Sequence, residues 1–306
     1  MKRSAIDVLR RGFENALANW PLVLLRIAEA VVMAMIVIGA VIAAVIPVVV
    51  SAGLNKFDIG NPQNVAEFFA SLVLEHWMLL GYLFGLAFVI LGVLIAVHSF
   101  VEAGSAQIYV DGERVAGSRA FAIDRWLGGG RKGWWAVFWI YNFAWSVGGL
   151  IILIPAIFTI LFMLIVSEAG ARVAIGCVGL ALMVVLMMPV AVLVGMWTQK
   201  AIAVCVARSL GAADALRAAR REIKLDFGRH FLVMLLLIVI GFIAGGIISG
   251  VSFPFSFAGG SSHRGASLLP LFFAPVQIVL SLLQTAASAA MGAWSLASFV
   301  ALTEER

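Results

Sequence analysis

The chain alternates long apolar runs with short polar segments that carry most of its charged residues. A helix needs about 20 apolar residues to cross the hydrocarbon core of a bilayer, and six runs reach that length. Several runs exceed 30 residues, so we expect helices that tilt, kink or extend beyond the membrane. The pattern predicts an all-α fold, a single polytopic membrane domain over 1–306. Its six transmembrane helices are predicted at about 20–50, 76–103, 134–167, 172–206, 229–251 and 270–301.

The composition excludes a soluble domain. Hydrophobic residues make up 63% of the chain and charged residues 12%, whereas soluble domains are roughly 45–50% apolar and about 25% charged. Disorder would need the opposite bias, with low hydrophobicity and high charge. The two cysteines, Cys177 and Cys205, provide neither a disulfide framework nor a thiolate metal site.

The segment before each odd-numbered span predicts a short basic amphipathic helix at the membrane surface, followed by a small or polar turn. These segments lie at about 5–11, 121–126 and 214–224. Ser4 and Asp214 are predicted N-caps. We therefore expect three helical hairpins, each with a cytoplasmic interfacial helix on its entry side. In the first such helix, one face carries the apolar residues Ile6, Leu9, Phe13, Leu17 and Trp20.

The distribution of Lys and Arg predicts the orientation. Seventeen of the 21 basic residues precede an odd-numbered span or follow the last one, and only three lie in the opposite loops. Basic residues concentrate on the cytoplasmic side of membrane proteins. We therefore expect a multi-pass protein of the bacterial inner membrane with both termini in the cytoplasm.

Arg26 and Glu29 stand three residues apart within the first span, so they share a helix face and can pair. Ionisable side chains inside a span usually face the interior of the helix bundle or water. One interpretation is a structural or lipid-anchoring pair, because Arg26 lies close enough to Trp20 for its guanidinium to extend to the headgroups. The other is a site on a transport pathway.

His98 and Glu102 stand one helical turn apart near the cytoplasmic end of the second span. Such a pair is half of a metal site or an acid–base pair in some enzymes. No second motif in the sequence completes it, so the favoured interpretation is an interfacial polar pair.

The segment 212–229 concentrates positive charge next to the fifth span. Each basic side chain near an anionic leaflet contributes about 1 kcal/mol of attraction. The segment therefore predicts contact with anionic lipid headgroups. Nucleic acid binding is not expected, since the basic residues flank apolar spans. The predicted headgroup-binding residues are Arg217, Arg220, Arg221, Lys224 and Arg229.

Two small-xxx-small patterns in the fifth span, Gly241 to Gly245 and Gly246 to Gly250, allow close approach of helix backbones. With six spans in one chain, packing within the molecule is the favoured interpretation. A membrane-protein partner or a second copy of the chain is the alternative.

No catalytic, metal or cofactor motif is found in the sequence. The glycine-rich stretch 128–133 follows no predicted strand and lacks the Gly-Lys-Ser/Thr ending of a phosphate-binding loop. The expectation is a protein that is not an enzyme and needs no cofactor.

The stretch 215–221, which leads through 227–231 into the fifth span, resembles a group of bacterial six-span membrane proteins. The group includes the membrane domain attached to some glycerophosphoryl diester phosphodiesterases and its stand-alone relatives. The order of all six spans agrees. The 306 residues contain no segment like the soluble phosphodiesterase barrel. The resemblance therefore implies a membrane-embedded module, and no catalytic residue of a hydrolase carries over to this sequence.

These patterns together predict a non-catalytic inner-membrane module or scaffold that associates with anionic lipid and whose small-residue helices pack tightly or recruit a partner protein. The alternative is a transporter or permease for a small or lipid-like solute that uses Arg26 and Glu29.

Overall fold

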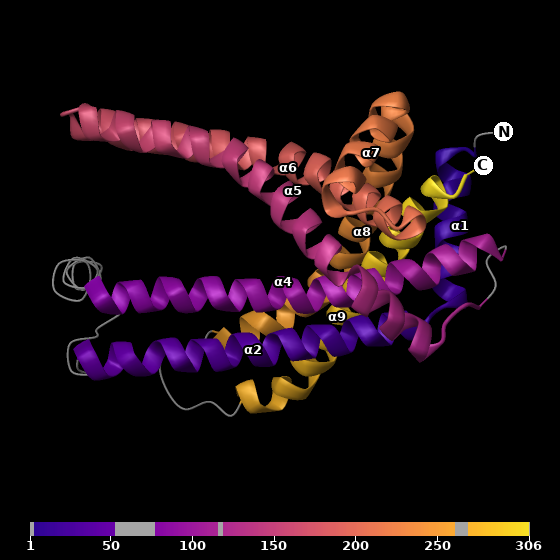
Figure 1. Cartoon of the computed structure of the whole chain (residues 1–306). Helices are drawn as coiled ribbons and strands as arrows, with labels where there is room; N and C mark the ends of the chain where they lie inside the picture. Colours follow the sequence, from indigo (N-terminus) through magenta and orange to yellow (C-terminus); the bar gives the residue numbers. More distant parts are fainter. Residues whose placement is uncertain (1–2, 53–76, 116–118, 261–268, 306) are drawn as a thin grey trace. The chain divides into compact units, whose positions relative to one another are not determined.

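The computed structural model describes residues 3–52, 77–115, 119–260 and 269–305, and every element in these ranges is an α-helix (Figure 1). Six helices are long and apolar enough to cross a membrane, as the sequence predicts. The chain is therefore an all-α, multi-pass membrane protein. In chain order the helices are α1 (Ala5–Ala18), α2 (Pro21–Ala52), α4 (Trp77–Arg114), α5 (Ile123–Ile165), α6 (Ala169–Arg208), α7 (Ala212–Leu225), α8 (Phe227–Gly260) and α9 (Leu269–Thr303).

The two short helices, α1 and α7, are the amphipathic helices expected before the first and fifth spans. Ser4 caps α1 as predicted, because its hydroxyl accepts from the backbone N–H of Asp7 while the Asp7 carboxylate accepts from the backbone N–H of Ser4. The predicted cap of α7 is wrong. Its N-cap is Gly211, and Asp214 lies in the first turn, where a carboxylate still interacts favourably with the helix dipole.

The segment before the third span differs from the prediction of a separate helix and turn. Residues from Ile123 onward belong to α5, whose 43 residues extend about 65 Å, roughly twice the hydrocarbon thickness. Glycine is a poor helix former, but here it permits tight packing. A Cβ at Gly129 would lie 2.6 Å from Gln107 Cβ, and one at Gly130 would lie 2.8 Å from the Phe100 ring. The contact with α4 therefore overrides the local preference for a turn.

Contacts divide the chain into two compact units, Ala28–His98 and a larger one of Met1–Ile27 with Ser99–Arg306. In the smaller unit, α2 and α4 run side by side in opposite directions (Figure 1), and Tyr82 Oη donates to the carbonyl of Ala43 at 3.3 Å. In the larger unit, α5 packs along α6 and α8 packs along α9. These are the three expected hairpins.

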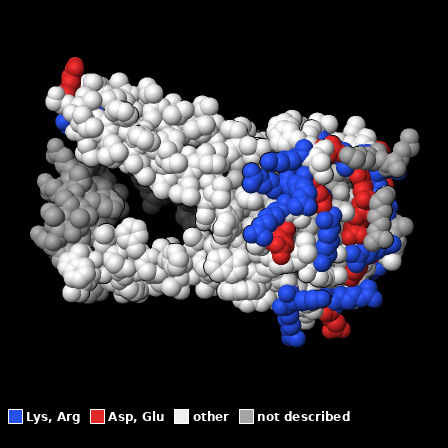
Figure 2. Space-filling view, turned by 45° about the horizontal axis from the view of Figure 1, so that its top comes forward, with Lys and Arg blue, Asp and Glu red and all other residues white. Residues whose placement is uncertain are grey.

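The core of the larger unit lies at its charged end. Its largest fully buried side chains include Tyr109, Lys200, Phe299 and Leu296. Figure 2 shows most of the visible Lys, Arg, Asp and Glu gathered at the same end. By contrast, no more than 11% of the most apolar window of any span is buried within the protein. The apolar parts of the helices are thus left for lipid.

Helix α1 shows the same arrangement on a small scale. Its inward face consists of Ala5, Val8, Gly12, Asn15 and Ala16, with Leu9 beside them. The larger apolar side chains predicted on one face with Leu9 are mostly exposed; they are Ile6, Phe13, Leu17 and Trp20. The protein contact is therefore made by small residues and Asn15 together with Val8 and Leu9, and most of the bulky apolar residues are left for the membrane.

Several glycines make close helix contacts, but those of the predicted small-residue patterns do not. A Cβ on Gly12 of α1 would lie 2.7 Å from backbone atoms of Ser298 on α9. In the fifth span, a Cβ on Gly241 would reach only Met291, at 3.7 Å. At Gly245 and Gly246 it would meet no described atom within 4 Å. Among the described residues, packing within the molecule therefore does not account for the pattern from Gly246 to Gly250.

We expect Gly12→Ala to lower the midpoint of thermal unfolding in detergent. The new methyl group meets backbone that cannot rotate away, and overpacking of this kind costs about 1–3 kcal/mol. Gly128→Ala is the matched control, since nothing lies within 4 Å of its Cβ, and it should gain up to about 1 kcal/mol from helix propensity. Equal midpoints for the two variants would contradict the close contact of α1 with α9.

Candidate functional site

Helix α7 carries four of the five predicted headgroup-binding residues, and the structure gives it two distinct faces. Ala215, Leu216, Ala219 and Ile223 are buried. The opposite side is exposed and carries the basic row, which we define as Arg217, Arg220, Arg221 and Lys224. The periodicity of the sequence produces this arrangement, because apolar residues recur every three to four positions and basic residues occupy the turns between them.

A buried ion pair fixes α7 against α6. Lys200 of α6 is fully buried, and its Nζ lies 2.9 Å from Oε2 of Glu222 on α7. The same ammonium donates to the hydroxyl of Thr303 at 2.9 Å and to the carbonyl of Leu302 at 3.3 Å, both on α9. Arg208 also contacts Glu222. Burial raises the pKa of the Glu222 carboxyl, but Lys200 and Arg208 outweigh it and hold that pKa below its usual range.

A tryptophan provides the second connection between these helices. Trp197 of α6 donates its indole Nε1–H to the carbonyl of Leu216 on α7 at 3.0 Å. The bond satisfies the only polar atom of the indole. It also sets the ring against α7, so that its apolar face becomes part of a cavity wall.

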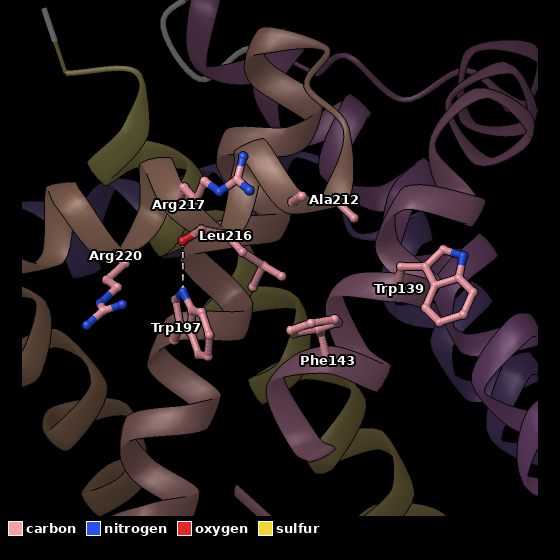
Figure 3. A pocket seen from close by; sticks show the side chains of 8 residues that line it. Trp139, Phe143, Trp197, Ala212, Leu216, Arg217 and Arg220 are labelled. Carbon is pink, nitrogen blue, oxygen red and sulfur yellow. Dashed lines mark hydrogen bonds between the residues drawn. The ribbon is translucent and has the colours of Figure 1, made fainter. Parts of the chain in front are cut away.

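That cavity lies between α5, α6 and α7 and has a volume of about 390 Å³. Its aromatic lining consists of Trp139 and Phe143 from α5 and Trp197 from α6 (Figure 3). Helix α7 contributes Ala212, Ala213 and Leu216 together with the basic side chains of Arg217 and Arg220. The volume falls in the range of small-molecule sites, and the lining is mainly apolar with few charged groups, as such sites usually are.

The two arginines of the cavity differ in their partners. Arg217 Nη1 lies 3.2 Å from Oδ1 of Asp214, and both side chains are largely exposed. Among the described residues, no carboxylate pairs with Arg220. Arg220 is therefore the cation of the cavity whose charge is available to a ligand.

Arg229, the fifth predicted headgroup residue, belongs to the interior. Its guanidinium contacts Asp226 at 3.1 Å and Glu305 at 2.6 Å, and it donates to the backbone carbonyl of Arg3. Only 15% of its side chain is exposed. These contacts neutralise Arg229 within the protein and separate it from the basic row.

A cluster of exposed and half-buried aromatic residues of α5 begins beside the cavity. Trp134, Trp135, Phe138 and Trp139 contact one another in sequence, with ring centroids 5.2–6.5 Å apart. Trp139 is 45% exposed. Tryptophan concentrates at the boundary between lipid and water, so this cluster indicates that the cavity opens near that boundary.

Each of the predicted polar residues of the first span, Arg26 and Glu29 on α2, contacts a side chain of α4. In the larger unit, Arg26 donates to Glu102, which also accepts from Gln199. In the smaller unit, His98 Nδ1 lies 2.6 Å from Oε1 of Glu29. Arg26, Glu29 and Glu102 are all buried. The sequence grouped these four residues by spacing along one helix, and spacing carries no information about a partner on another helix.

Two buried asparagines in and after α1 were not predicted from the sequence. Asn15 donates to the carbonyl of Tyr109 on α4. Asn19 accepts from the backbone N–H groups of Ala120 and Phe121 at 2.9 Å, which joins the α1–α2 turn to the segment before α5. The only sequence signal was their four-residue spacing on a helix whose apolar stripe lies elsewhere.

Comparisons with protein-family models, with curated proteins and with solved structures found no match. The resemblance to the six-span membrane proteins therefore stays a prediction. Chemically, the cavity provides a positive charge next to an apolar wall. Among the described residues, no three metal-ligating side chains come together.

We expect Glu222→Gln to destabilise the protein, because it leaves the ammonium of Lys200 buried without a counter-charge. Breaking a buried pair costs roughly 3–5 kcal/mol, and partial exposure of Glu222 places the loss at the lower end. Adding Lys200→Met should restore part of the midpoint of thermal unfolding in detergent. A double variant less stable than Glu222→Gln alone would contradict this account.

The stabilisation by Glu222 should also depend on pH. The folded-state pKa of this carboxyl is depressed, so its contribution is present above the unfolded pKa of about 4.3 and is lost as pH falls through the folded value. The difference in midpoint between the natural protein and Glu222→Gln should therefore shrink between pH 7 and acid. A difference that is constant over this range would show that the charge of Glu222 is not what stabilises the fold.

Proposed function

We propose that this chain is a non-catalytic module of the bacterial inner membrane that binds anionic phospholipid through the basic row of α7. The observation that carries the proposal is the fixed exposure of Arg217, Arg220, Arg221 and Lys224 on one side of a helix whose other side is buried. A cationic surface beside membrane spans attracts anionic headgroups. The distribution of Lys and Arg along the sequence predicts that this surface faces the cytoplasm.

Several features support a structural module over an enzyme. The buried charged side chains contact oppositely charged or hydrogen-bonding neighbours, as in Lys200 with Glu222 and Arg26 with Glu102. Such pairs stabilise a packed core without performing chemistry. We also propose that the module needs no cofactor, binds no nucleic acid and has both termini in the cytoplasm. The proposal also includes a protein partner or second copy, for which the open glycines of α8 leave room.

The transport alternative gains no specific support. Arg26 and Glu29 are buried, and each contacts a side chain of suitable chemistry within its own unit, Glu102 and His98 respectively. These contacts are those of structural pairs.

The test is native mass spectrometry of the protein released gently from its own membrane and titrated with phosphatidylglycerol. The triple variant Arg217→Ala, Arg220→Ala and Arg221→Ala removes three charges. At about 1 kcal/mol each, its apparent affinity should fall by up to roughly a hundredfold.

The matched control removes the same charge from exposed positions outside α7, through Arg119→Ala, Arg125→Ala and Arg131→Ala. It should lose much less affinity. Equal losses in the two triple variants would mean that net charge alone attracts lipid. No loss in the α7 variant would refute the proposal.

A further inference from the structure

The cavity beside α7 has a property that the basic row as a whole lacks. Trp139 and Phe143 line one side of it, and Arg217 and Arg220 of α7 line the other, with Trp197 between the two groups in the view of Figure 3. Only two of the four basic side chains line it. Arg221 and Lys224 are exposed on the same helix and contribute nothing to its walls.

From this arrangement we infer that the cavity is a site for one anionic phospholipid, with the phosphate at Arg220 and part of an acyl chain against Trp139 and Phe143. The inference rests on the proposed function and deepens it. It replaces a diffuse attraction with a single binding site of defined orientation.

We assign the contact with the lipid phosphate to Arg220 because the other polar groups of the cavity already have partners. The Trp197 indole N–H is used by the carbonyl of Leu216. The Arg217 guanidinium shares its charge with Asp214. Arg220 has no carboxylate partner among the described residues, and guanidinium binds phosphate through two parallel hydrogen bonds.

The apolar contact identifies the ligand as a lipid. A free phosphate would satisfy Arg220 and leave the aromatic walls without a partner. A hydrocarbon chain matches those walls, and the cavity of about 390 Å³ has room for more than a phosphate group. The aromatic walls come from α5 and α6, which are both candidate spans, so a lipid can enter from the bilayer without leaving it.

The position of the cavity is fixed by the contacts that fix α7. The Lys200–Glu222 pair and the Trp197–Leu216 bond hold α7 over α5 and α6. A ligand therefore meets walls that are already in place, which lowers the entropy lost on binding.

The experiment compares single variants of two neighbouring arginines by native mass spectrometry in detergent. The natural protein should retain one phosphatidylglycerol. Arg220→Gln should weaken its retention about tenfold, because one charge-assisted contact is lost. Arg221→Gln removes the same charge from the basic row but outside the cavity, so its loss should be clearly smaller than that of Arg220→Gln.

A second variant tests the apolar part without changing any charge. Ala213→Trp places an indole in the cavity from α7 and should displace the lipid, while the midpoint of thermal unfolding stays at that of the natural protein. Inorganic phosphate and phosphatidylcholine with the same chains serve as competing probes. Neither should replace phosphatidylglycerol at equal concentration.

Equal loss in Arg220→Gln and Arg221→Gln would overturn the single-site inference and leave the lipid-binding function of α7 standing. Displacement by inorganic phosphate would overturn it in favour of a soluble anion. Undiminished retention in Ala213→Trp would show that no chain enters the cavity. Failure of the proposed function itself would appear separately, as a triple α7 variant that binds phosphatidylglycerol like the natural protein.

Discussion

The charge of Lys200 is the constraint on which the charged end of the larger unit depends. An ammonium removed from water must be neutralised and hydrogen-bonded, or its burial costs several kcal/mol. Glu222 supplies the counter-charge from α7, and Thr303 and Leu302 supply acceptors from α9. One buried side chain on α6 thus determines where two other helices lie. The end of the chain is held as well by the buried Arg229, through Glu305, and by the half-exposed Arg114, through Glu304.

The buried core of the larger unit lies at its charged end because the apolar lengths of the spans are surrounded by lipid. Apolar spans gain little by leaving hydrocarbon for each other, so association must come from close packing and polar contacts. The structure follows this rule at Gly12 against Ser298, and at Asn19, whose side-chain oxygen accepts two backbone N–H groups. The same rule also explains α1, which buries Ala5 and Gly12 and leaves Ile6 and Leu17 exposed.

The sequence predicted what depends on local pattern. Span length, helical periodicity and the cap at Ser4 are properties of neighbouring residues, and they located the six spans and both short helices. Apart from the N-cap of α7, what it missed depends on residues distant in the chain. The glycines before the third span form helix because α4 packs on them, and Glu102 reaches Arg26 from 76 positions away. The basic row was found from composition, but the cavity was not, because its walls come from three helices.

The charge of α7 comes from its own sequence, whereas the cavity beside it comes from the packing of three helices. The proposed attraction to anionic lipid and the proposed recognition of one lipid molecule therefore have different physical causes. A peptide with the sequence of α7 would keep its cations and its attraction to anionic lipid. It would lack Trp139, Phe143 and Trp197, and nothing would hold Arg220 over an apolar wall. Lys200 and Trp197 supply that geometry, and Lys200 is in turn held by the end of α9. The proposed recognition of a single lipid therefore depends on the folded bundle, whereas the proposed attraction needs only the helix.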